Sequence, residues 1–164
     1  MKTIKLTLIL TVLSFGTFAQ TFEIPNYKLQ NAEDYDTSEN DIVNCVDWLM
    51  KTPINDQVDK RKDANAFLMK WISGSPKVHI EIKQEIVTFM DSPDLLMIFI
   101  GTWAKYSIES KDFNNKINGT MTGIESVIDF YTKNKGQISK NKGVEKYIKM
   151  KEKGTLKEYV EKNS

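Results

Sequence analysis

Residues 92–110 have the sequence SPDLLMIFIGTWAKYSIES, which predicts the central helix of an all-α protein. Ser92 followed by Pro93 is typical of a helix start, because the first helical position needs no backbone N–H and favours proline. The run Leu95–Ile100 is apolar on all sides, as expected for a helix that its neighbours surround. It is too short to span a membrane. Gly101 indicates that one neighbouring helix approaches closely.

Apolar residues at helical spacing predict further helices on both sides of this one. Between the second and third of them, Lys77–Glu81 is expected to be extended and Lys83–Met90 helical. A single short strand has no partner, so no sheet is expected. The fold class is therefore an irregular all-α bundle of six to seven helices, with at most one extended segment near 77–82. The main predicted helices comprise residues 39–51, 57–73, 93–110, 116–133 and 144–153, and a short last helix follows Gly154.

Several polar residues and glycines predict where these helices begin and end. Ser38 fits the N-cap of the 39–51 helix. Gly74 fits a left-handed turn after the 57–73 helix, with Pro76 redirecting the chain. Thr155 and Glu158 have the spacing of a capping box for the last helix.

The N-terminus predicts a cleavable signal peptide at residues 1–19. Lys2 and Lys5 precede a short apolar run, and Thr17-Phe18-Ala19 places small residues where signal peptidase reads them. Cleavage after Ala19 predicts a periplasmic or secreted protein without a transmembrane span. The mature chain is then an extended arm at 20–35 and one helical domain at 36–164.

The charges are unevenly distributed along the chain. Residues 20–132 contain 11 Lys and Arg against 18 Asp and Glu, whereas residues 133–164, the Lys-rich C-terminal helices, contain 10 Lys against 4 Glu. Such a tail is most simply a solvated face, and the alternative is a surface for anionic lipid headgroups or an acidic partner. Arg61 is the only arginine beside 22 lysines. Lysine lacks the flat fork with which arginine recognises phosphates, so nucleic acid is not an expected partner.

Residues suited to catalysis or metal binding are few. His79 is the only histidine and Cys45 the only cysteine, and Cys45 lies on the apolar stripe of its helix, where a thiolate is costly. The acidic run at 34–40 resembles half of a calcium loop but lacks its glycine and its final glutamate, so helix capping explains it better. We therefore expect no catalytic residue, metal ligand or cofactor site.

The three tryptophans are the other candidates for a binding site. Trp48, Trp71 and Trp103 lie on three different predicted helices. They most simply share the core, since large aromatic side chains dominate core burial. The alternative is an aromatic groove for a peptide, sugar or lipid, with His79 as a further candidate contact.

The segment AFLMKWISGSP, residues 66–76, resembles a stretch that recurs in small exported all-helical proteins of Gram-negative bacteria. Lys70-Trp71, Gly74 and Pro76 are its distinctive residues. The resemblance implies an exported helical domain. The group has no assigned activity, so no functional residue is carried over.

These observations favour a non-enzymatic binding or interaction protein of the cell envelope. Its partner would be an envelope protein, a peptide or an anionic surface. One alternative is a hydrolase that uses two carboxylates in a cleft, which requires acids that converge in a pocket. Another is a carrier of a small ligand or lipid, which requires an internal apolar cavity.

Overall fold

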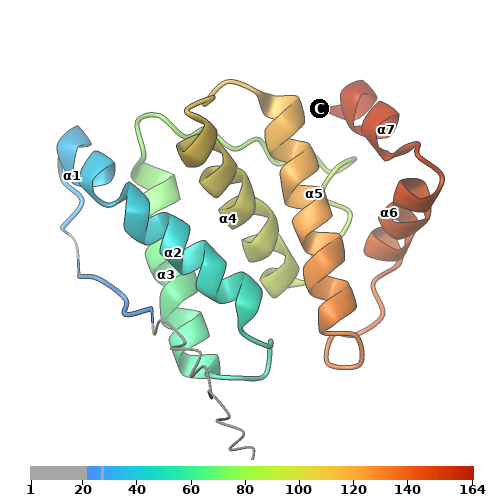
Figure 1. Ribbon diagram of the computed structural model, residues 1–164, viewed down its shortest axis with the longest axis horizontal. Coiled ribbons are helices and arrows are strands. Elements are labelled where there is room, and N and C mark those ends of the chain that lie inside the picture. Colours follow the sequence, from blue (N-terminus) through green and yellow to red (C-terminus); the bar gives the residue numbers. More distant parts are fainter. Residues whose placement is uncertain (1–21, 27) are drawn as a thin grey trace, which may run out of the picture.

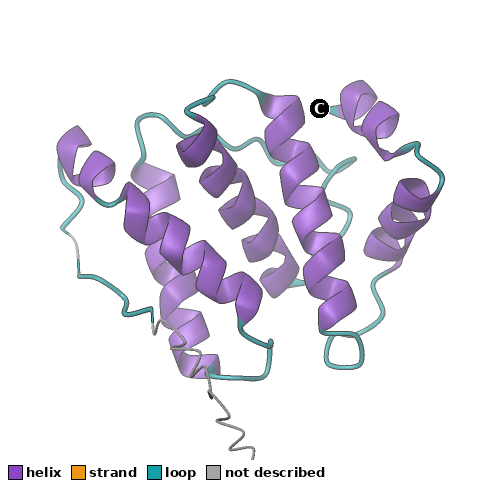
Figure 2. Cartoon of the chain, viewed as in Figure 1, coloured by secondary structure: helices purple, strands orange, loops and turns teal. Residues whose placement is uncertain are grey.

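A computed structural model describes residues 22–26 and 28–164, and the predicted signal peptide lies outside these residues. The described residues form seven α-helices and no β-strand, which confirms the all-α prediction (Figures 1 and 2). No helix in this part of the chain is long and apolar enough to cross a membrane. The helices are α1 (Ala32–Thr37), α2 (Glu39–Lys51), α3 (Val58–Gly74), α4 (Pro93–Ser110), α5 (Lys116–Lys133), α6 (Lys142–Glu152) and α7 (Leu156–Asn163).

Helix α4 lies at the centre of the bundle, between α2 and α5 (Figure 1). Ten of its residues are buried, as its all-round apolar sequence predicts. Gly101 is the point of close approach, because a Cβ atom there would lie 2.8 Å from Cδ2 of Leu68 and 3.2 Å from Cγ2 of Val46. The pairing of α4 with α5 depends in the same way on Gly119 and Gly123 of α5.

Helix α1 falls partly inside the predicted extended arm. Asn31 and Asp34 form a capping box, in which the Asp34 carboxylate accepts from the backbone N–H of Asn31 at 2.9 Å. These bonds start a helix at Ala32, so the last four residues of the predicted arm are helical. The rest of the described arm packs on the bundle, with Phe22 and Leu29 buried.

Three of the predicted helix ends use different contacts from those expected. Gly74 is the last residue of α3 without a left-handed backbone; its missing Cβ makes room for the Tyr35 hydroxyl. Ser38 lies at the start of α2 but donates to Asp34 O at 2.8 Å instead of capping α2. Thr155 makes no capping bond to α7, because its hydroxyl donates to Met150 O.

The predicted helix at Lys83–Met90 is wrong, because this segment forms separate turns. Its carbonyls are bound from the C-terminal helices. Tyr147 Oη donates to Ile86 O at 2.6 Å, and Tyr159 Oη donates to Glu85 O at 2.7 Å. These bonds dock α6 and α7 on the bundle, and the two tyrosine rings pack edge to face, 5.9 Å apart.

Candidate functional site

The three tryptophans occupy separate places in the core. Trp48 packs against Phe22 with ring centroids 6.2 Å apart, and Trp71 lies at the same distance from Tyr35. Trp103 packs edge to face on Phe99 of its own helix, 5.7 Å apart. Each is less than a tenth exposed. No ring contact joins any two of them in the part of the chain described, so the structure does not bring them together into one groove.

Trp71 has an additional polar role. Its Nε1 donates to Ser38 Oγ at 2.9 Å and to Tyr35 O at 3.2 Å. A buried indole N–H needs such a partner, and here it joins α3 to the junction of α1 and α2. The contact therefore gives Trp71, the first residue of the WISG sequence, a structural role.

His79 and Cys45 lie in different surroundings. The His79 side chain is exposed in the segment after α3, whereas Cys45 is fully buried in α2, with its thiol 3.5 Å from Ala64 O. Burial raises the pKa of the Cys45 thiol to about 12. A thiol that keeps its proton is a poor nucleophile, so Cys45 has a packing role.

The protonated thiol predicts a stability loss at high pH. The folded protein keeps the thiol proton at pH values at which the unfolded chain, with a thiol pKa of 9.0, releases it. The contribution of the neutral thiol to the free energy of unfolding is therefore complete below pH 9.0 and is lost towards pH 12. Between about pH 8 and pH 10.5 the natural protein should lose about 2 kcal/mol more unfolding free energy than Cys45→Ala. Urea unfolding of both proteins at each pH measures this difference, because other titrating groups cancel. Equal losses would contradict a buried neutral thiol.

The acidic residues at 34–40 make contacts within the fold. The Asp34 carboxylate caps α1 by accepting from two backbone N–H groups, which lower its pKa. Asp36 pairs with Lys77 at 2.6 Å. Among the described residues no group of three or more His, Cys, Asp or Glu side chains is placed to hold a metal ion.

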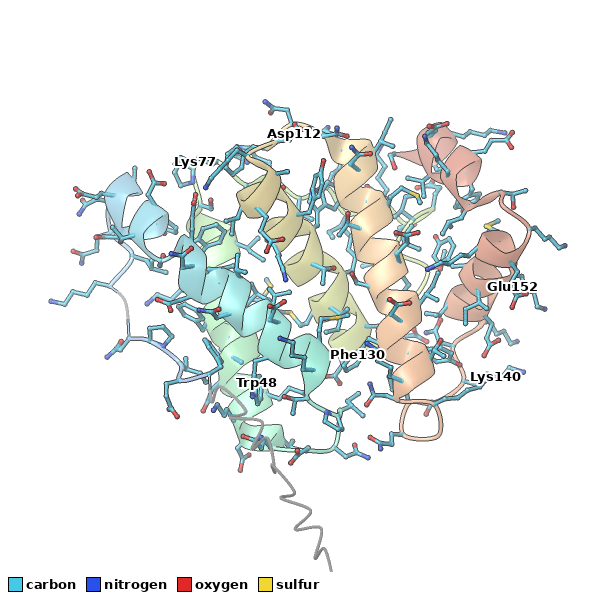
Figure 3. All side chains as sticks on the ribbon, viewed as in Figure 1. Trp48, Lys77, Asp112, Phe130, Lys140 and Glu152 are labelled. Carbon is cyan, nitrogen blue, oxygen red and sulfur yellow. The ribbon has the colours of Figure 1, made fainter. Side chains whose placement is uncertain are left out.

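A cluster of lysines on α6 and directly beside its two ends is the site that the structure adds. We call these residues the lysine face: Lys140, Lys142, Lys146, Lys149 and Lys153. All five are exposed, and they line one open hollow of about 530 Å³ together with Glu145, Met150 and Thr155. Lys140, just before α6, is labelled in Figure 3.

The helical repeat explains why these lysines lie together. Lys142, Lys146, Lys149 and Lys153 follow one another at intervals of four, three and four residues, which places them on one stripe of the helix. Lys151 is on the opposite side, where it lies 4.0 Å from both Glu125 and Asp129 of α5. Contacts with α5 therefore balance the inner charge of α6 and leave the outer stripe positive.

The lysine face has little negative charge of its own. None of its five ammonium groups forms an ion pair with a carboxylate of the described residues. The one carboxylate in the hollow, Glu145, accepts a hydrogen bond from Tyr131 Oη at 3.0 Å. Lys146 lies over the Tyr159 ring, 4.5 Å from its centroid, which holds that ammonium group in place. The arrangement can attract an extended anionic surface.

Sequence reasoning identified the basic tail but not this face. The spacing of the four lysines was the available signal. The spacing does not reveal the ion pairing of Lys151. This pairing decides which side of α6 stays positive.

Comparison of the chain with family models, with curated proteins and with solved structures finds no match in any of the three.

Proposed function

We propose that this protein is a non-enzymatic binding protein of the cell envelope, and that the lysine face is the surface that meets its partner. The supporting observation is five exposed lysines around one hollow that contains a single carboxylate, Glu145, with which none of them forms an ion pair. The rest of the mature chain is acidic, so an anionic partner is attracted to this surface in preference to others. The predicted signal peptide supports the envelope as the place of action.

The hydrolase alternative needs two carboxylates that converge in a cleft. Three surface hollows of the described chain each contain a single acidic side chain, namely Asp112, Glu81 and Glu145. The pKa of Glu81 is lowered, and the largest cause is a hydrogen bond from Lys116. A general acid needs a raised pKa, so Glu81 is not suited to that role.

The carrier alternative needs an apolar cavity that can hold a ligand. The most enclosed of these hollows lies beside Trp103 and has a volume of about 10 Å³. That is room for one water molecule at most. In the core, Phe89 and Phe99 are fully buried, with their ring centroids 5.9 Å apart. This packing favours binding at the outer surface.

The first test is whether the lysine face retains the protein in the envelope of its own host. The variant replaces Lys142, Lys149 and Lys153 by glutamine, because these side chains have no hydrogen bond or ion pair among the described residues. The matched control replaces Lys28, Lys51 and Lys62, three exposed lysines elsewhere, by glutamine. We expect retention in the washed envelope fraction to fall about tenfold or more for the first variant only.

Both variants change the net charge equally, so a difference between them reports the position of the charge. Native mass spectrometry of the natural protein, released gently from that fraction, then identifies any protein or small ligand that travels with it. Equal retention of all three proteins, or none of them in the envelope, would overturn the proposal.

A further inference from the structure

We infer that the partner of the lysine face is the anionic surface of a lipid bilayer, to which the protein binds without inserting. This inference rests on the proposed function, since it names the partner of the same surface. Three observations support it: the charges of the face are all lysines, they lie at one end of the molecule, and no large apolar side chain of residues 133–164 is exposed.

The chemistry of the face suits many loosely placed anions. Lysine presents a mobile point charge, whereas arginine presents a fixed planar fork that selects one phosphate or carboxylate. All five charges of the face are lysines, and the one arginine of the chain is buried elsewhere. Lipid headgroups are a fluid layer of anions without fixed positions. A set of mobile lysine charges can pair with such a layer and needs no shaped pocket.

The position of the charge gives the molecule an orientation at such a surface. Helices α6 and α7 lie at one end of the longest axis and α1 at the other (Figure 1). Helix α1 contains Glu33, Asp34 and Asp36, and residues 20–132 have a net charge of −7 against +6 for residues 133–164. An anionic membrane therefore attracts the α6 end and repels the α1 end, which turns the lysine face towards the lipid.

Residues 133–164 offer little exposed apolar surface for deep insertion. The exposed large apolar side chains of the described chain all lie outside residues 133–164; they are Val58, Met69, Ile82, Met90 and Ile117. On α6 the side chains of Val144 and Tyr147 are buried against the bundle. Met150 is the one large apolar side chain that lines the hollow, and it is partly buried, so binding is mainly electrostatic and reversible by salt.

The experiment measures co-sedimentation of the protein, purified in the form that accumulates in its host, with lipid vesicles. One set contains phosphatidylglycerol and phosphatidylcholine in equal parts, and the other contains phosphatidylcholine alone. We expect binding to the anionic vesicles only, and loss of binding as the salt concentration rises from about 0.05 M to 0.5 M. Glutamine at Lys142, Lys149 and Lys153 should weaken the affinity about a hundredfold, and the control at Lys28, Lys51 and Lys62 much less.

Inorganic phosphate separates a membrane from a free anion as the ligand. At equal ionic strength it should displace the protein from anionic vesicles no better than chloride does. Equal binding to neutral vesicles, or equal affinity of the two variants, would overturn the inference. Envelope retention that depends on the lysine face, without binding to anionic vesicles, would overturn the lipid as partner and leave the proposed function standing.

Discussion

Replacement of Arg61 by alanine is expected to lower the free energy of unfolding by about 3–4 kcal/mol. This side chain is only 4% exposed, and its Nη2 atom donates to Leu49 O at 3.2 Å, to Thr52 O and to Pro53 O. These carbonyls lie at the C-terminal end of α2 and just after it, where a helix has acceptors without partners of its own. The cation also complements the negative end of the α2 dipole.

The guanidinium group also joins three helices. It lies 5.4 Å from the ring centroid of Phe130 in α5 and 5.9 Å from that of Trp48 in α2, both labelled in Figure 3. Burial lowers the pKa of Arg61, and the carboxylates of Asp94 and Asp56 oppose this effect. Arginine keeps its charge even so, and the buried charge is stabilised by the carbonyls and the rings around it.

Two further variants separate the hydrogen bonds from the packing. Arg61→Met keeps an unbranched stem without donors and should lose about 2–3 kcal/mol, and Arg61→Lys, with one donor group, about 1–2 kcal/mol. Lys62→Ala, at the exposed neighbouring position, should change stability by less than about 0.5 kcal/mol. Urea unfolding measures all four. A methionine variant as stable as the natural protein would show that the carbonyls do not need the arginine.

The elements that were predicted correctly are those whose signals are local. The limits of α2, α4 and α5 agree with the sequence, because apolar spacing and Pro93 act within a few residues of each helix end. The start of α6 is two residues earlier than expected, since Asn141 accepts from Val144 N at 3.1 Å.

The elements that were missed depend on contacts between distant residues. The turns at 83–90 are held by Tyr147 and Tyr159, which lie some sixty to seventy residues further along the chain. Gly74 has a sequence position typical of a C-cap, but its function is to admit the Tyr35 ring. The same holds for the candidate site. The excess of lysine can be read from the sequence, but which side of α6 stays positive depends on the contacts of α5 with Lys151.

Gly123 is the second position where a large effect is expected. At an exposed helical site, replacing glycine by alanine stabilises a protein by about 1 kcal/mol, because glycine loses more backbone entropy. In α5 the sign should reverse. A Cβ atom on Gly123 would lie 2.6 Å from Cδ2 of Phe99 and 3.1 Å from the Phe99 carbonyl oxygen. The ring can shift only by moving other core residues, and the carbonyl belongs to the central helix.

We therefore expect Gly123→Ala to lower the free energy of unfolding by about 1–2 kcal/mol, and Gly123→Val by about 3 kcal/mol or more. The effect arises because α4 and α5 must separate, and α4 is the helix on which the other core helices pack. Thr132→Val, which keeps a branched shape on the exposed side of α5, is the matched control and should change stability by less than about 0.5 kcal/mol. A Gly123→Ala protein more stable than the natural one would mean that the helices do not meet at this glycine, and that the centre of the bundle is packed differently.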